Sequence, residues 1–143
     1  MPIEAWDAHN PRNTDGDALA DAYVDTLRDI LESVPTDQVM AAGVEESAVT
    51  AVRAGDPAQV AIEDAAVMLA IASSQFDAVE MRYELLDRLL IGMTNAVLDV
   101  DTVAHRIAFD RSPTELQQRI EGREPMGLDE YAHIWHEIAS RSP

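Results

Sequence analysis

Apolar residues recur along this chain at intervals of three and four residues, and this spacing restricts the fold more than any other feature. The first such stretch has apolar side chains at i, i+3, i+4 and i+7, which is typical of a helix with one buried face. Its members are Ala18, Leu19, Ala22, Tyr23, Leu27, Ile30, Leu31 and Val34. A longer stretch runs from Phe76 or Asp77 to Leu98. Because β-branched residues show no period-two alternation, the predicted fold class is all-α.

Residues that favour helix ends divide the chain further. Thr14 or Asp15 is the expected N-cap of the first helix, and Pro35 ends it because the residue before a proline disfavours the α region. Asp101 is the expected cap of a later helix. The clearest start is the segment 112–115, where Ser, Pro and Glu form a capping box around a proline at the first helical position. Short helices are expected at about 37–42, 46–54, 62–73, 102–108, 113–121 and 128–140.

The long helix of the second half carries more apolar residues than one face can hold. Its buried stripe is predicted to contain Val79, Tyr83, Leu86, Leu89, Leu90, Met93 and Val97. Leu85, Ile91 and Leu98 widen that stripe, which favours burial on two sides. A homodimer would account for the second side.

The order of the helices indicates an internal repeat. Residues 37–41 align with residues 101–105, and Gly55 and Gly122 each precede a proline-containing loop and another helix. A longer helix with an inward tyrosine, Tyr23 or Tyr83, leads each copy. We therefore predict a compact helical bundle built from two four-helix units. Their boundaries are 14–74 and 76–143, after an irregular N-terminal arm at 1–13 that contains Trp6.

The composition narrows the class of protein. The net charge is -17, every positive charge comes from Arg because the chain has no Lys, and Cys is absent. A hydrophobic content of 47% argues against disorder, and the missing Cys excludes disulfides and thiolate metal sites. The longest apolar run, 65–72, falls far short of the ~20 residues of a membrane helix. With no signal peptide at its start, the chain is expected in the cytoplasm.

The spread of the acids along the chain suggests adaptation to salt. Acidic surfaces with little Lys resemble those of salt-in haloarchaea, whose cytoplasm holds molar salt. Self-repulsion at this charge would strain the compact state in dilute buffer, whereas at ~1 M salt the Debye length falls to ~3 Å. We therefore expect a haloarchaeal protein whose fold needs salt.

Each half resembles a helix-turn-helix of the phage-repressor type (lambda-repressor/Cro-like). The residues that carry the resemblance are Val44, Val49, Val52 and Gly55 in the first half, and Phe109, Leu116, Ile120, Glu121 and Gly122 in the second. The whole chain also resembles a small haloarchaeal family of acidic proteins with uncharacterised function. The first resemblance implies double-stranded DNA as a partner and a transcriptional regulator as the function.

The second half is the better candidate for a DNA contact. Residues 101–143 carry a net charge of -3, against -14 for residues 1–100. At the start of the helix at 113–121, Thr114, Gln117 and Gln118 would meet base edges. Arg111, Arg119 and Arg123 flank that face and would reach phosphates. A positive or neutral surface there favours DNA, and an acidic one favours the alternative below.

The alternative is a helical protein-interaction or scaffold module, homodimeric and without nucleic-acid binding, because helix-turn-helix geometry also serves for packing. A metal enzyme ranks third. Glu130, His133, His136 and Glu137 lie on one helix at ligand-like spacing, but a carboxylate-bridged bundle needs Glu-x-x-His twice and it occurs once. We expect no catalytic residue, no metal site and no cofactor.

Overall fold

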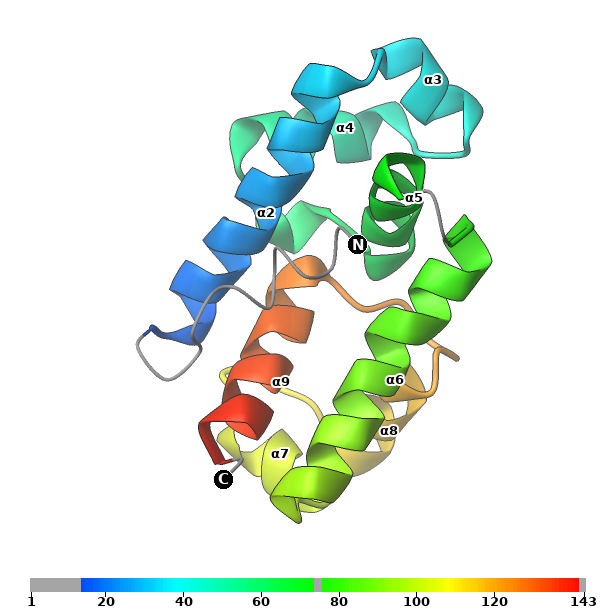
Figure 1. Cartoon of the computed structure of the whole chain (residues 1–143). Helices are drawn as coiled ribbons and strands as arrows, with labels where there is room; N and C mark the ends of the chain where they lie inside the picture. Colours follow the sequence, from blue (N-terminus) through cyan, green and yellow to red (C-terminus); the bar gives the residue numbers. More distant parts are fainter. Residues whose placement is uncertain (1–13, 74–75, 142–143) are drawn as a thin grey trace.

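In the computed structural model, residues 14–73 and 76–141 are described, and the regular structure in these ranges consists of helices with no strand, so the all-α prediction is confirmed (Figure 1). The predicted arm at 1–13 lies outside the described residues. The helices are α2 (Gly16–Ser33), α3 (Thr36–Ala41), α4 (Glu46–Ala54), the 3-10 helix η2 (Pro57–Gln59), α5 (Ile62–Ala72), α6 (Ala78–Ala96), α7 (Val100–Arg106), α8 (Pro113–Ile120) and α9 (Leu128–Arg141).

Capping explains where several helices begin. The Asp15 carboxylate accepts a hydrogen bond from the Ala18 amide at 2.7 Å and caps α2. The predicted capping box of α8 is present, since the Glu115 amide donates to the Ser112 hydroxyl at 3.1 Å and the Ser112 amide donates to the Glu115 carboxylate at 3.0 Å.

The predicted cap of α7 is wrong. Asp99, not Asp101, accepts the hydrogen bond from the Thr102 amide, at 2.8 Å, and α7 starts at Val100. Asp101 therefore lies inside the first turn, where a carboxylate still interacts favourably with the helix dipole. Both acids suit a helix start, and only the backbone path decides which of them caps it.

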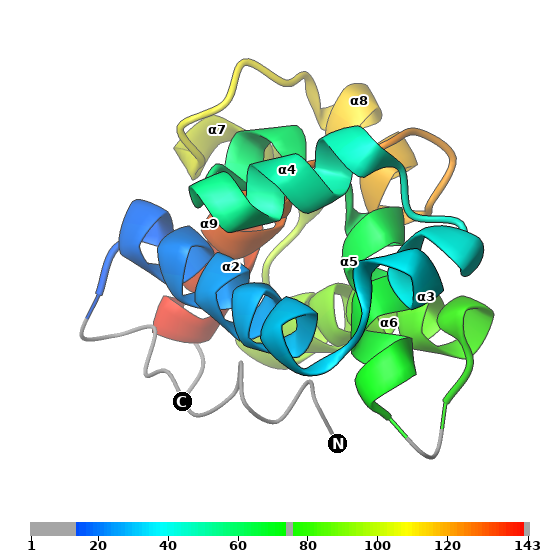
Figure 2. The ribbon, with the colours of Figure 1, turned by 90° about the horizontal axis from the view of Figure 1, so that it is seen from above.

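The two halves of the chain are interleaved. The first long helix, α2, packs mainly on α9, the last helix, while α5 packs on the second long helix, α6 (Figures 1 and 2). Backbone hydrogen bonds join the segments that precede α5 and α9: the Leu128 amide donates to the Val60 carbonyl at 2.7 Å, and the Ile62 amide to the Met126 carbonyl at 2.9 Å. Each half is thus closed by a helix of the other, and buried residues from both form one core.

The predicted buried stripe of α6 is partly wrong. The residues of α6 that are buried are Met81, Leu85, Leu86, Leu89, Gly92 and Met93. The predicted members Val79, Tyr83, Leu90 and Val97 are exposed. The reason is tertiary, because the main neighbours α5 and α9 contact α6 on the side of Leu85 and Leu89 and leave the other side uncovered.

Candidate functional site

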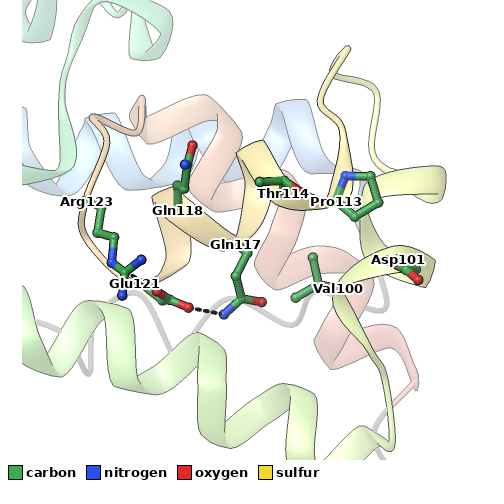
Figure 3. A pocket seen from close by; sticks show the side chains of 8 residues that line it. All are labelled: Val100, Asp101, Pro113, Thr114, Gln117, Gln118, Glu121 and Arg123. Atoms are coloured by element: carbon green, nitrogen blue, oxygen red, sulfur yellow. Dashed lines mark hydrogen bonds and ion pairs between the residues drawn. The ribbon is translucent and has the colours of Figure 1, made fainter.

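Most of the candidate DNA-contact residues lie around a shallow depression where α8 meets the start of α7 (Figure 3). Its volume is about 330 Å³. The lining residues are Val100, Asp101, Pro113, Thr114, Gln117, Gln118, Glu121 and Arg123. Four of the six predicted contact residues, those at 114, 117, 118 and 123, are therefore brought together. Arg111 and Arg119 are not part of this lining.

Glu121 holds two of these side chains. The Gln117 amide donates to one oxygen of the Glu121 carboxylate at 2.6 Å, and the Arg123 Nε lies 3.2 Å from the other oxygen (Figure 3). The lining carries two carboxylates, Asp101 and Glu121, against one guanidinium. The depression therefore has a negative balance, in contrast to the positive field on which most DNA affinity depends.

The other two arginines form ion pairs inside the molecule. The guanidinium of Arg111 contacts one carboxylate oxygen of Glu130 at 3.1 and 3.2 Å, and the Arg119 Nε lies 3.7 Å from the second oxygen. Glu130 is only 2% exposed. Burial raises the pKa of the Glu130 carboxyl above its usual value, although both arginines favour the charged form. The two arginines thus neutralise a buried acid.

The sequence did not reveal this role of Glu130. It lies 19 residues after Arg111 and 11 after Arg119, and only the packing of α9 beside α8 and its preceding loop brings the three together. A glutamate in the first turn of a helix is ordinarily read as a dipole partner at the surface. Its position among the inward residues of α9, which include Ile134 and Ile138, was the one available signal.

The histidines of α9 point to a different place. His133 Nε2 lies 2.8 Å from the Asp17 carboxylate, and His136 Nε2 lies 2.7 Å from the Thr14 carbonyl oxygen. Both therefore tie α9 to the start of α2, whereas Glu130 pairs with the arginines. In the part of the chain that is described, no three His, Asp or Glu side chains come together as a metal site.

A second candidate surface is the open side of α6. Its exposed apolar residues, hereafter the α6 stripe, are Val79, Tyr83, Leu90, Ile91 and Val97. Their exposed fractions range from 39% for Leu90 to 90% for Val97. The acids Glu80, Glu84 and Asp87 are exposed on the same helix. In Figure 1 this helix runs along one side of the molecule.

None of the described helices is long and apolar enough to cross a membrane. No curated protein and no solved structure matches the chain. One family model does match, and it covers residues 19–141, from the first turn of α2 to the last residue of α9. The chain belongs to this family, a family of unknown function (DUF5791).

Proposed function

We propose that this protein is a helical protein-interaction module and that the α6 stripe is its docking surface. The observation that carries the proposal is the exposure of Val79, Tyr83, Leu90, Ile91 and Val97 on one helix. Single exposed apolar residues are ordinary, but a contiguous apolar patch with a polar rim marks an interaction site. On a helix of 3.6 residues per turn, Val79, Tyr83, Leu90 and Val97 share one face. The adjacent face carries Glu80, Glu84 and Asp87, with Ile91 between them, and these acids supply such a rim.

The depression between α8 and the start of α7 also favours an interaction module over a DNA-binding protein. Two arginines that would reach phosphates are paired with buried Glu130, and a third, Arg123, is paired with Glu121. Without these charges, DNA binding would depend on hydrogen bonds and shape. We also propose, from the composition, that the protein works in a high-salt cytoplasm, where apolar contacts outlast charge-based ones.

Site-specific photo-crosslinking in cells tests the docking surface. A photoreactive residue at Ile91, which is 61% exposed, should give a discrete protein adduct, either with a second copy or with another protein identified from its peptides. The matched control is Ser47, which is exposed at the start of α4. Adducts at Ile91 no stronger than those at Ser47 would contradict the proposal.

DNA binding through α8 is the second candidate, and the gathering of Thr114, Gln117 and Gln118 at one depression favours it. A glutamine amide can bond adenine at two points. Binding to genomic fragments in ~2 M KCl tests it, where the field of phosphates is screened. Gln118→Ala should then weaken binding about tenfold, and Asn95→Ala on α6 should have no effect. An absence of binding at every salt concentration would exclude this candidate.

A further inference from the structure

We propose that the occupant of the α6 stripe is a second copy of this chain, whose α6 runs antiparallel to the first about a two-fold axis near residue 88. This inference rests on the proposed function and specifies its partner. The spacing of the apolar residues, the distribution of charge along the helix and the backbone conformation at Val97 support this occupant.

The apolar residues on this side of α6 follow a coiled-coil period. Val79, Tyr83, Leu86, Leu90, Met93 and Val97 are separated by four, three, four, three and four residues. This 3.5-residue repeat matches the seam of two helices that pack along their length. Leu86 and Met93, each 6% exposed, border the core, while the other members face outward. The seam therefore continues from the core into the open side of the helix.

The seam is also self-complementary. A two-fold interface must place one surface patch against itself in reverse. About an axis near residue 88, Val79 meets Val97 of the second copy, Tyr83 meets Met93, and Leu86 meets Leu90. Every layer is therefore apolar on both sides. Val79 and Val97 are exposed in the monomer, whereas in the two inner layers exposed Tyr83 and Leu90 pack on the edges of Met93 and Leu86, which are mostly buried in the core.

The charges favour the antiparallel direction. Glu80, Glu84 and Asp87 lie exposed in the first half of α6, whereas residues 89–98 contain no charged side chain. The first half also holds Arg82 and Arg88, which turn toward the Gly122 carbonyl and the Trp135 ring and leave the carboxylates as its outward charges. An antiparallel pair places the acidic half of each helix over the uncharged half of the other, and only Asp87 comes near its own copy. A parallel pair would gather six carboxylates at one end, with like charges and helix dipoles aligned.

The backbone conformation at Val97 is an observation that does not depend on the spacing or the charge of the helix. It ends α6 in a left-handed conformation, with φ 54°, and is 90% exposed. A β-branched residue is unfavourable there, and the other positive-φ residues in the described ranges are Gly43, Gly55 and Gly122. An apolar side chain held out to solvent from a strained position is accounted for if it packs on Val79 of the second copy.

The expected dimer is weak. The 19 residues of α6 span about 28 Å, which gives an interface at the small end of the range for specific complexes. We expect a Kd on the order of micromolar in high salt. Sedimentation equilibrium of the purified chain in ~2 M KCl should therefore show a mass that rises toward twice 15.7 kDa with concentration.

Tyr83→Glu combined with Leu90→Glu should abolish this rise while leaving the far-UV circular dichroism unchanged, because both side chains are exposed in the monomer. The matched control is Met40→Glu, an exposed apolar residue on α3 that should leave the dimer intact. A wild-type chain that stays monomeric at every concentration, or a control as disruptive as the pair, would overturn the proposal.

Single cysteines test the direction, since the chain has none of its own. Mixing the Val79→Cys and Val97→Cys variants under mild oxidation should join the two different chains by a disulfide, and neither variant alone should dimerise covalently. A disulfide within each single variant and none in the mixture would indicate a parallel pair and overturn the proposal.

The Val97→Gly variant distinguishes the backbone strain at this position from the contact that the Val97 side chain makes in the proposed dimer. It should raise the thermal stability of the dilute monomer, because glycine tolerates the left-handed conformation, yet weaken the dimer about tenfold. An unchanged dimer would contradict the role of Val97. If the chain is monomeric while Ile91 still crosslinks to another protein, the second copy is excluded and the interaction module stands. If both results are negative, both proposals fail.

Discussion

The two long helices that lead the halves, α2 and α6, have similar lengths and similar caps but different surroundings. Each begins after a capping aspartate, Asp15 or Asp77, and each carries a tyrosine one to two turns further on. Tyr23 on α2 is fully buried and its ring lies 6.3 Å from that of Tyr131, whereas Tyr83 on α6 is 60% exposed. On α2 the apolar face is covered by α9, and on α6 only one of two apolar faces is covered.

The difference shows that an apolar pattern specifies a surface to be buried but not the molecule that buries it. The two helices also differ in the charge on their exposed faces. The exposed face of α2 is a stripe of acids that no apolar partner would cover, whereas residues 89–98, which form the second half of α6 and the two residues after it, carry no charge. We therefore expect changes on α2 to act on folding and changes on the open side of α6 to act on association.

The two tyrosines give the largest expected contrast. Tyr23→Ala should lower the free energy of unfolding by about 3–5 kcal/mol, because a large buried ring leaves a cavity. Tyr83→Ala should change it by less than about 0.5 kcal/mol in the dilute monomer. Urea unfolding of both variants at low protein concentration measures the difference. Equal losses would mean that Tyr83 is part of the monomer core and would remove the contrast.

Helix α9 contacts both long helices. A change at Glu130, the buried acid of α9, therefore tests the packing that both long helices depend on. Glu130→Ala should lower the free energy of unfolding by about 3 kcal/mol, because Arg111 and Arg119 lose the carboxylate that neutralises them. Denaturant unfolding measures this loss, and Glu137→Ala near the end of α9 is the control. A variant as stable as wild type would show that the arginines find solvent without cost.

The same acid predicts a pH dependence. Because burial raises the pKa of Glu130 in the folded state, the folded chain binds this proton more tightly than the unfolded chain. Relative to Glu130→Gln, the wild type should therefore lose stability as the pH rises from about 4.5 through the raised pKa. Melting curves of both proteins across this range give the sign, and a parallel course would contradict it.

Each long helix has a glycine where it lies close to side chains of α9, Gly16 on α2 and Gly92 on α6. We expect an alanine at either position to have a similar effect on stability. A Cβ on Gly16 would lie 2.6 Å from the His133 ring carbons, and one on Gly92 would lie 2.7 Å from Ile138 Cγ2. Each Gly→Ala change should therefore cost about 1–2 kcal/mol, the overpacking strain being partly offset by helix propensity. Asn95→Ala is the control for propensity alone. A loss at Gly92 only would show that α2 can move away from α9.

The acids of α2 give the smallest effect. Asp21→Asn with Asp29→Asn should raise the Tm by about 1–2 °C in ~0.1 M KCl and leave it unchanged in ~2 M KCl, because like charges one turn apart repel until salt screens them. Glu84→Gln with Asp87→Asn on α6 is the matched pair, and it should act less on Tm because Arg82 and Arg88 balance that helix. A Tm of the wild type that does not rise with salt would contradict the proposed adaptation to salt.

Most local signals were predictable from the sequence, the cap of α7 being an exception, whereas long-range contacts were not. The capping box at 112–115 depends on neighbours within a few residues, and the structure has it as expected. The ion pairs of Glu130 and the exposed side of α6 depend on where α9 and α5 pack. The long helix has apolar residues on two faces, so its periodicity alone left open which face is buried.

Each half of the chain is covered by a helix of the other half. The order in which the helices are synthesised therefore affects folding. The cover of α2 is α9, which is synthesised after all the other described helices, so the apolar face around Tyr23 stays open until α9 has left the ribosome. Contacts between such distant segments form late and slow the folding rate. Buried residues of both halves form one core cluster, in contrast to chains whose domains mature one by one during translation. We expect a single cooperative transition once α9 is available, and a nascent first half that depends on its surroundings to remain soluble.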